Sequence, residues 1–240
     1  MKSIAVFCGS SEGYLETYME QAYKLGGELA ERGIEVVYGG AKVGLMGAVA
    51  DGVLDNEGKI TGVIPNFLQT KEVAHEGLTE LIVVNTMHER KMKMYERCDG
   101  VIILPGGWGT MDEMFEMLTW GYLGMHQKPV GLLNINGYYD ALKAMNSTMV
   151  QEGFLNEWAR SILIFDADLE SLLEKMENYN APELPKVINK QATEARIKCP
   201  KKAYATIIAT TTLTKSANNP HISAYFVFLI FTLPKYTANT

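Results

Sequence analysis

The sequence predicts an α/β protein of the doubly wound, Rossmann-like kind, with a parallel sheet of about seven strands and helices on both faces. Three observations lead to this prediction: short runs rich in Val and Ile alternate with segments of helical length, the runs are almost continuously apolar, and glycine-rich loops follow several of them. Continuous apolarity is typical of strands buried on both faces. Alternation of strands and helices favours parallel strands joined by right-handed crossovers.

Seven short apolar runs are the expected strands, and six longer segments between them are the expected helices. We place the strands at residues 4–8, 34–38, 60–64, 81–84, 101–104, 130–133 and 162–165. We place the helices at residues 15–32, 45–56, 87–98, 111–124, 138–152 and 169–179. Gly33 is a stop signal after the first helix, and Thr86 with Glu89 has capping-box spacing at the start of the third. Because ligands of such sheets bind beyond the carboxyl ends of the strands, function is expected in the loops that follow them.

The alternation stops near residue 180, which divides the chain into an expected Rossmann-like domain, residues 1–180, and a C-terminal extension, residues 181–240. The extension begins with a proline-containing segment, 181–185, and ends in an aromatic run at 225–231. It holds eight Lys and Arg against two Asp and Glu, whereas residues 1–180 hold 14 against 26. We therefore expect an acidic body and a basic tail outside the main fold, whose apolar run could pack on the body, mediate association or aggregate.

Charge and composition disfavour several classes of partner and cofactor. An acidic body argues against a nucleic-acid partner, because that binding relies on a basic face that neutralises phosphates. The apolar run at 225–231 has seven residues, whereas a membrane-spanning helix needs about 20, and the N-terminus does not resemble a signal peptide. The cysteines Cys8, Cys98 and Cys199 form no CxxC pair, and the four histidines form no HExxH motif. We therefore expect no disulfide framework, no metal site and a cytoplasmic protein.

Three loops at expected strand ends combine glycines with small polar residues: CGSS at 8–11, GGAKVGLMG at 39–47 and PGGWGT at 105–110. Glycine lets the main chain approach an anion, and a helix that begins just beyond it directs free N–H groups at that anion. One such loop is most often only a turn, but three on one sheet edge favour a phosphate ligand. Since neither GxGxxG nor GxxxxGK[ST] occurs at these positions, a nicotinamide enzyme and a P-loop NTPase are disfavoured and a mononucleotide remains.

Charged residues near two of the expected helix starts allow two interpretations each. Glu113 follows Thr110 with capping-box spacing, so it could only close the first helical turn, or it could face a developing cation on a sugar beside the anion site. Arg90 and Lys91 fall in the first turn of the helix at 87–98, where cations oppose the helix dipole unless an anion is bound. A solvated helix face is the alternative, but two cations near three anion-ready loops favour phosphate.

Two segments resemble the paired signature of a known family. MHERK at 87–91 followed by PGGWGTMDE at 105–113 is similar to the signature of the lonely-guy (LOG) family, the cytokinin riboside 5′-monophosphate phosphoribohydrolases, which also carry the older label lysine decarboxylase-like. Further similarity lies in CGSS at 8–11, VYGG at 37–40, GLMG at 44–47, LTW at 118–120, GMHQKP at 124–129 and NGYY at 136–139. The resemblance covers residues 1 to about 180 and does not explain residues 181–240.

The resemblance implies an activity, a site and an assembly. It implies hydrolysis of the N-glycosidic bond of a purine nucleoside 5′-monophosphate, of the cytokinin type or AMP, to free base and ribose 5-phosphate, without a cofactor. It implies Arg90 and Glu113 as the catalytic pair. The substrate contacts that it implies are Ser10, Gly40, Gly44, Met46, Glu72, Lys91, Gly106, Gly107, Gly109, Thr110, Asp112 and Thr119. Because family members form at least homodimers, a homodimer or higher homo-oligomer is expected.

Physical argument gives Glu113 two tasks in such a reaction, since a carboxylate can stabilise an oxocarbenium-like ribosyl cation or activate water. Binding of the phosphate would orient the sugar, and Arg90 could bind that phosphate or orient Glu113. Two other functions stay open at this point. One is a non-catalytic carrier of a nucleotide or phosphorylated cofactor on the same fold. The other is amino-acid decarboxylation with pyridoxal phosphate, for which no Schiff-base lysine stands out.

Overall fold

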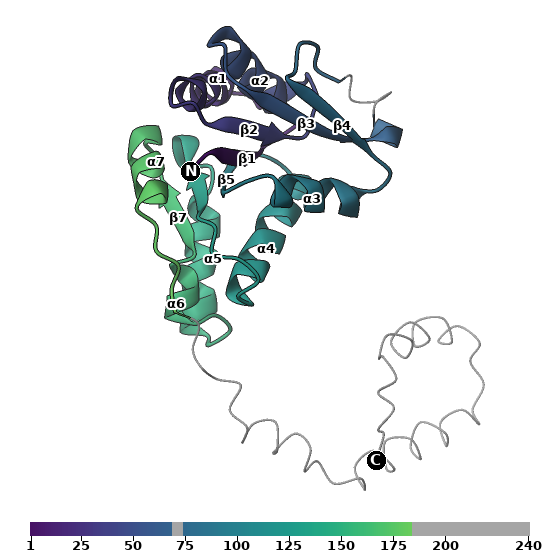
Figure 1. The fold of residues 1–240 in the computed structure, drawn as a ribbon. Helices are drawn as coiled ribbons and strands as arrows, with labels where there is room; N and C mark the ends of the chain where they lie inside the picture. Colours follow the sequence, from purple (N-terminus) through teal and green to yellow (C-terminus); the bar gives the residue numbers. More distant parts are fainter. Residues whose placement is uncertain (69–73, 184–240) are drawn as a thin grey trace, which may run out of the picture. The chain divides into compact units, whose positions relative to one another are not determined.

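The sheet contains seven parallel strands, which confirms the predicted fold class. The computed structural model describes residues 1–68 and 74–183. The strands are β1 (Ser3–Phe7), β2 (Glu35–Tyr38), β3 (Ile60–Pro65), β4 (Glu80–Val84), β5 (Gly100–Ile103), β6 (Val130–Leu133) and β7 (Leu163–Asp166). They lie in the order β4-β3-β2-β1-β5-β6-β7, and every neighbouring pair is parallel (Figure 1). The bounds differ from the predicted ones by at most one residue.

All six expected helices are present. They are α1 (Glu16–Glu31), α2 (Gly44–Asp55), α3 (Met87–Glu96), α4 (Trp108–Tyr122), α5 (Asp140–Gln151) and α7 (Leu169–Glu177). A short helix, α6 (Glu157–Arg160), and two 3-10 turns, η1 (Asn66–Leu68) and η2 (Ile135–Gly137), were not expected. Elements of one turn contain too few residues to show a hydrophobic period, so sequence patterns do not reveal them.

The start of α3 follows the predicted capping arrangement with one difference. The Thr86 hydroxyl oxygen accepts a hydrogen bond from the Glu89 N–H at 3.1 Å, as a capping box requires. The Glu89 carboxylate, however, accepts the N–H of Asn85 at 2.8 Å, one residue before the cap. Both bonds satisfy main-chain N–H groups at the end of the helix, and they fix the direction in which α3 leaves β4.

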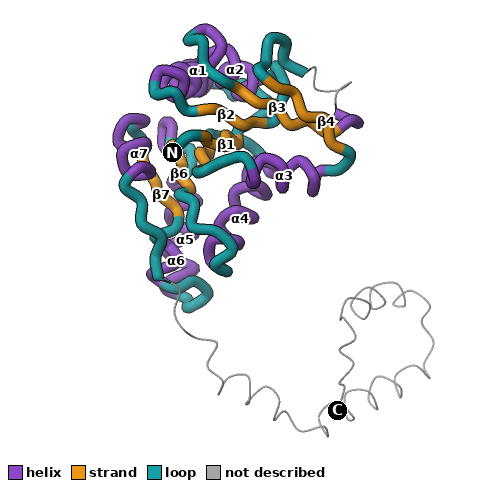
Figure 2. Tube along the Cα trace, viewed as in Figure 1, coloured by secondary structure: helices purple, strands orange, loops and turns teal. Residues whose placement is uncertain are grey.

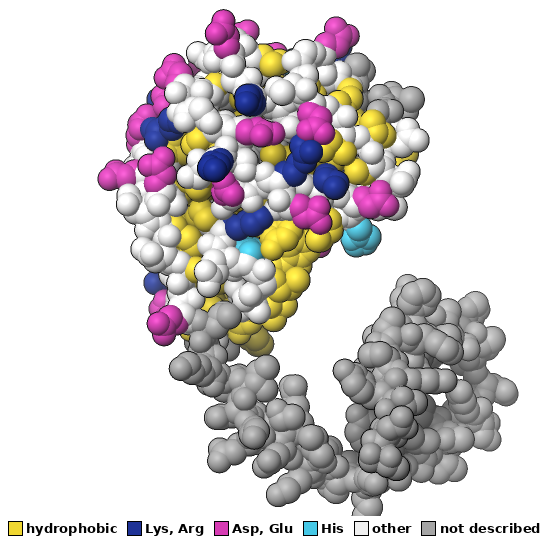
Figure 3. Space-filling model, in the orientation of Figure 1, with side chains coloured by type: hydrophobic (Ala, Val, Ile, Leu, Met, Phe, Trp, Pro, Cys, Tyr) yellow, Lys and Arg dark blue, Asp and Glu magenta, His cyan; other side chains and the backbone are white. Residues whose placement is uncertain are grey.

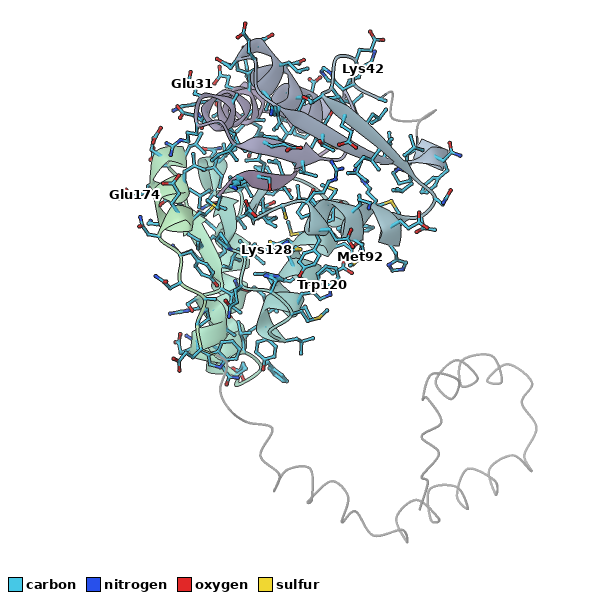
Figure 4. All side chains as sticks on the ribbon, viewed as in Figure 1. Glu31, Lys42, Met92, Trp120, Lys128 and Glu174 are labelled. Carbon is cyan, nitrogen blue, oxygen red and sulfur yellow. The ribbon has the colours of Figure 1, made fainter. Side chains whose placement is uncertain are left out.

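Alternate side chains of β1 pack into two separate hydrophobic cores, one on each face of the sheet. Ile4 and Val6 pack with buried residues of α1, α2 and α7, whereas Ala5 and Phe7 pack with buried residues of α3 and α4. The tube view shows these helix groups on different sides of the strands (Figure 2). Side chains of α3 and α4 fill the space between these two helices and the sheet (Figure 4). Burial on both faces explains the continuous apolar runs of β1, β2, β3, β5 and β6. The edge strand β4 differs, because its apolar residues Leu81 and Val83 are exposed.

The strand order reverses at β1, whose neighbours are β2 and β5. The chain leaves β1 into α1 on one face of the sheet, and it leaves β5 into α4 on the other face. The loops that follow β1 and β5 therefore diverge, and a crevice opens between them at the carboxyl edge of the sheet. This is the place where open α/β sheets bind ligands.

The described residues include no helix that is long and apolar enough to cross a membrane. The expected tail lies outside the described residues from residue 184 onwards, as does Cys199. Cys8 and Cys98 are free thiols.

Helices α1 and α2 approach each other closely because glycines lie at their contact. A Cβ atom added at Gly26 would overlap the main-chain oxygen of Val49, whereas one added at the adjacent Gly27 would lie 3.0 Å from the side-chain nitrogen of Asn56. A main chain inside a helix cannot move aside cheaply, but the end of a side chain can.

We expect Gly26→Ala to lower the free energy of unfolding by about 1–3 kcal/mol, although alanine favours helix more than glycine. Gly27→Ala is the matched control in the same helix, and its effect should be smaller. Urea unfolding followed by circular dichroism measures both. Equal stability of the two variants would show that the close contact of α1 and α2 does not limit residue size at position 26.

Candidate active site

A cavity of about 280 Å³ lies in the crevice between the β1 and β5 loops. Its walls come from the loops after β1, β2 and β5 and from the facing sides of α3 and α4. The residues that line it are Val6, Phe7, Cys8, Gly9, Ser10, Gly39, Met46, Met87, Arg90, Met94, Gly107, Trp108, Gly109, Thr110, Asp112 and Glu113. All three glycine-rich loops of the sequence therefore contribute to one cavity.

The first turn of α4 forms one wall and presents free main-chain N–H groups. Gly107 is the N-cap residue, and no side chain caps the helix. The N–H of Met111 is the first to bond back along the helix, to the oxygen of Gly107 at 3.1 Å. The N–H groups of Trp108, Gly109 and Thr110 precede it and have no partner within the helix, which is the usual condition of a helix start. This wall therefore suits an anion.

The capping-box interpretation of Thr110 and Glu113 is wrong, because α4 begins at Trp108 and not at the predicted residue 111. Thr110 is the third helical residue, and its buried hydroxyl packs against Gly106. Glu113 consequently lies in the second turn rather than the first. Its carboxylate does not close the helix end, which removes the purely structural explanation that the spacing suggested.

Arg90 reaches the cavity from α3 with only 8% of its surface exposed. Its Nε–H donates to the main-chain oxygen of Val63 at 3.1 Å, and Nη2 donates to that of Gly39 at 3.2 Å. These carbonyls lie near the carboxyl ends of β3 and β2, so the guanidinium is fixed to the edge of the sheet. Arg90 takes part in none of the ion pairs among the described residues. Two of its five N–H donors are used by the main chain.

Glu113 faces the same cavity from α4, and burial raises the pKa of its carboxyl group from 4.5 to about 7. The nearby cations Arg90 and Lys91 lower the pKa, and the carboxylates of Asp112 and Glu116 raise it further. Desolvation therefore outweighs attraction to the cations. A carboxyl group that titrates near neutral pH can act as an acid or a base in this cavity.

Lys91 connects α3 to α4 instead of facing the cavity. Its ammonium lies 3.0 Å from a carboxylate oxygen of Asp112 and 3.0 Å from one of Glu116. Burial lowers the pKa of Lys91, but the hydrogen bonds that its ammonium donates to both carboxylates outweigh this and raise the pKa, so the ammonium stays charged. The pair of ion bonds holds the two helices that carry Arg90 and Glu113 at a fixed separation.

The remaining described residues of the cavity wall are apolar or unreactive. Met46, Met87 and Met94 bring three thioethers to the cavity, and Trp108 is 93% exposed at its edge. Burial raises the pKa of the Cys8 thiol, and the Glu113 carboxylate adds to this, so the thiol stays protonated and is a poor nucleophile. No lysine is among the described residues that line the cavity, which leaves a Schiff base with pyridoxal phosphate without an obvious partner there.

The structure brings together eight of the residues that the sequence analysis expected at the site. They are Ser10, Met46, Arg90, Gly107, Gly109, Thr110, Asp112 and Glu113. Four others lie close by but do not line the cavity: Gly40, Gly44, Lys91 and Gly106. Thr119 lies about two turns further along α4, in a separate groove, and Glu72 lies outside the described residues. Contact with a substrate remains a prediction for all of them.

The sequence analysis did not predict Tyr138 and Tyr139 as residues of the site. Both follow η2, and their hydroxyls donate to main-chain oxygens of the segment before α4. The available signal was topological, since the segment 134–139 follows β6 at the same carboxyl edge as the three glycine-rich loops. It contains neither charged side chains before Asp140 nor a glycine cluster, so a search for phosphate loops does not find it.

The raised pKa of Glu113 makes folding pH-dependent. Between pH 4.5 and about 7 the unfolded chain releases the Glu113 proton while the folded chain keeps it, so this residue costs more stability as pH rises and its cost levels off above pH 7. We expect Glu113→Gln to raise the free energy of unfolding at pH 8 by up to about 3 kcal/mol, with less gain at pH 5. Urea unfolding at the two pH values measures the difference. The same gain at both would mean that Glu113 titrates as an ordinary carboxyl group.

Comparison with known proteins identifies relatives of this chain. A family model described as "Possible lysine decarboxylase" matches residues 46–176. The cytokinin riboside 5′-monophosphate phosphoribohydrolase LOG7 of Arabidopsis thaliana is 44% identical over 189 residues, which cover 79% of this chain and 87% of that protein. The probable cytokinin riboside 5′-monophosphate phosphoribohydrolase LOGL1 of Oryza sativa subsp. japonica is 48% identical over 176 residues, which cover 73% of this chain and 79% of that protein.

Solved structures with the same fold include proteins that are named for binding or carrying the molybdenum cofactor. The molybdenum cofactor binding protein of Rippkaea orientalis aligns with a TM-score of 0.56 and 23% identity, over 74% of this chain and 97% of that one. The Moco carrier protein of Chlamydomonas reinhardtii aligns with a TM-score of 0.55 and 19% identity, over 73% and 95%. At these identities the likeness shows the fold alone. The family follows instead from the sequence relatives and from the family model that spans the cavity-forming helices: the chain belongs to the LOG family, whose model carries the lysine decarboxylase description.

Proposed function

We propose that this protein hydrolyses the N-glycosidic bond of a purine nucleoside 5′-monophosphate and releases the free base and ribose 5-phosphate. The observation that carries the proposal is the arrangement of Glu113, Arg90 and the first turn of α4 around one cavity. The names of the curated relatives agree with this activity, since they are phosphoribohydrolases of cytokinin riboside 5′-monophosphates.

The 5′-phosphate binds at the first turn of α4 in this proposal. The free N–H groups of residues 108–110 and the guanidinium of Arg90 supply donors and positive charge, and Arg90 is already held in place by two carbonyls. Binding energy gained at the phosphate is remote from the scissile bond, so it can be used to orient the ribose. Lys91 is neutralised by two carboxylates and supports this arrangement by holding α3 against α4.

Glu113 then faces the anomeric carbon. It lies one helical turn beyond the anion-binding N–H groups, a rise of about 5.4 Å along α4, which suits the span of a ribose ring between its phosphate and its base. As the base departs, positive charge develops on the sugar. The ionised carboxylate stabilises that charge or takes a proton from the attacking water. Only the ionised form does this, so its pKa of about 7 places a substantial active fraction at neutral pH.

The base lies against the apolar side of the cavity. Met46, Met87 and Met94 are unbranched and polarisable, and such side chains pack well against aromatic rings and against irregular alkyl groups. This wall supports a purine base that carries an apolar N6 substituent, as in a cytokinin nucleotide, while AMP would fill it less completely. No cofactor is part of the proposal.

A panel of nucleotides tests the proposed function. AMP, an N6-prenylated AMP and the matching nucleosides are incubated with the full chain, and free base is measured by chromatography. We expect release from the monophosphates and at least about 100-fold slower release from the nucleosides, because the phosphate positions the sugar. Glu113→Gln should lower turnover by about 100-fold or more while the folded structure persists.

Each alternative outcome of this panel has a meaning. Unchanged turnover in Glu113→Gln would remove Glu113 from the reaction. Tight binding of the monophosphates without any release of base by the unaltered protein would contradict a hydrolase and identify a carrier.

We also propose that the protein acts in the cytosol as a homodimer. A groove of about 280 Å³ between α4 and α5 is lined by Phe115, Thr119, Tyr122, Met149, Phe154 and neighbouring residues. Figure 3 shows hydrophobic side chains gathered over α4, while charged side chains of both signs are interspersed elsewhere on that face. An exposed apolar surface of this kind suits a self-complementary contact about a two-fold axis. Such a contact would place Thr119 of one copy near a second copy.

The free thiols Cys8 and Cys98 support the cytosol as the compartment of this protein, because the cytosol is reducing.

Phe154→Asp should weaken the dimer. Phe154 is 88% exposed beside the groove, so a carboxylate there would be buried without a partner in a dimer. We expect a shift from dimer to monomer in analytical ultracentrifugation of the full chain. Tyr14→Asp, at an exposed tyrosine outside the groove, is the control. A dimer that persists unchanged in Phe154→Asp, or a monomeric unaltered protein, would contradict this assembly.

A further inference from the structure

Three successive carbonyl groups before α4 are each held by a hydrogen bond from another loop. The oxygen of Leu104 accepts the hydroxyl proton of Tyr139 at 2.8 Å, and the oxygen of Pro105 accepts the N–H of Gly9 at 2.9 Å. The oxygen of Gly106 accepts the hydroxyl proton of Tyr138 at 2.8 Å. The loop that leads into the anion-binding turn is therefore fixed at every peptide from 104 to 106.

The bond from Tyr138 has a direct effect on the N-cap of α4. The carbonyl of Gly106 and the N–H of Gly107 belong to one planar peptide group and point in opposite directions. Fixing the oxygen therefore fixes the direction of the N–H. Gly106 is packed closely, since a Cβ there would overlap the Thr110 hydroxyl, whereas a Cβ at Gly107 would meet nothing within 4 Å. On the Gly107 side the peptide is therefore not held by packing, and the free main-chain angles of glycine leave its direction to the hydrogen bond from Tyr138.

The main chain before Tyr138 is built to present the two rings. Asn136 and Gly137 both adopt left-handed conformations, with φ of 52° and 70°. The side chain of Asn134 closes this turn, since its oxygen accepts the N–H of Tyr139 at 2.7 Å and its amide donates to Asp140 at 2.8 Å. A left-handed non-glycine residue persists only where the surroundings determine it, and such residues concentrate at functional sites.

Ring packing sets the direction of the Tyr138 hydroxyl. Its ring meets Tyr139 edge-on at 4.8 Å between centroids and Tyr18 edge-on at 6.0 Å. Tyr139 is only 3% exposed and anchors the pair, whereas Tyr138 is 45% exposed. Removal of the Tyr138 hydroxyl alone therefore changes ring packing little. The effect of the hydrogen bond can then be measured separately from the effect of the ring.

We propose that Tyr138 is a positioning residue whose hydroxyl orients the Gly106–Gly107 peptide so that the start of α4 binds a phosphate monoester. This inference rests on the proposed placement of the 5′-phosphate at that turn. Tyr138 does not line the cavity of Arg90 and Glu113. It lines a neighbouring pocket together with Tyr18, Gly106 and Gly107, and it acts on the cavity through the main chain. Its hydroxyl determines how tightly the phosphate is held and has no part in breaking the glycosidic bond.

Tyr138→Phe in the full chain tests the inference, with Tyr18→Phe as the matched control. The hydroxyl of Tyr18 makes no hydrogen bond with the described residues, although its ring contacts the same neighbour. Titration calorimetry measures the Kd of ribose 5-phosphate, and steady-state kinetics with AMP measure KM and kcat. One neutral hydrogen bond corresponds to a factor of about three to ten. We expect Tyr138→Phe to raise Kd and KM by that factor with kcat within about twofold, and Tyr18→Phe to leave all three values within about twofold.

Other results would overturn the inference. It fails if Tyr138→Phe leaves the Kd of ribose 5-phosphate unchanged, if it lowers kcat without raising KM, or if Tyr18→Phe produces the same loss. The binding measurement is independent of turnover. A protein that binds ribose 5-phosphate but releases no base contradicts the hydrolase, while the ratio of Kd values still decides the role of Tyr138. A protein that binds no ribose 5-phosphate overturns both.

Discussion

Free main-chain N–H groups at the start of α4 are the feature on which the candidate site depends. They exist because no side chain caps the helix, and they face a cavity because β5 and β1 send their following helices to opposite faces of the sheet. An uncapped helix start is tolerable where a solvent-filled or ligand-filled cavity satisfies it. The glycines around it let the chain pass close to the β1 loop, and the bonds from Gly9, Tyr138 and Tyr139 replace the rigidity that side chains would otherwise supply.

The adjacent basic residues Arg90 and Lys91 have different electrostatic roles in the site. Arg90 and Lys91 are adjacent on α3, yet Arg90 is fixed by carbonyls and faces the cavity, while Lys91 is neutralised by Asp112 and Glu116. Arg90 and Lys91 both lower the pKa of Glu113, while the carboxylates of Asp112 and Glu116 that pair with Lys91 raise it. Burial then prevails, and the carboxyl group titrates near neutral pH instead of staying ionised at all physiological values. The stability lost by burying Glu113 is the cost of this tuning, a common trade between stability and function.

The fold and the chemistry of this chain have separate origins. The fold is shared with a molybdenum cofactor binding protein and a Moco carrier protein at 23% and 19% identity. In this chain the fold supplies a crevice at the reversal of strand order. In the proposed function, a carboxyl group beside a helix start that suits an anion is what favours hydrolysis of a phosphorylated N-glycoside over carriage. The groove between α4 and α5 lies on another part of α4, so one helix contributes a wall of the cavity, the Glu113 carboxyl group and residues of the apolar groove.

The sequence by itself determined the seven strands, the six long helices and the three glycine-rich loops, because short apolar runs mark the strands and the segments between them have the length of helices. It also singled out Arg90 and Glu113. Only the tertiary structure decided the start of α4, the separation of Arg90 from Lys91 and the neutral-range pKa of Glu113, since these depend on side chains from different elements meeting in space. The hydrogen bonds of Tyr138 and Tyr139, which follow β6, were also decided only by the tertiary structure. Their hydroxyls act on carbonyls more than 30 positions away, and no local pattern encodes a contact of that kind.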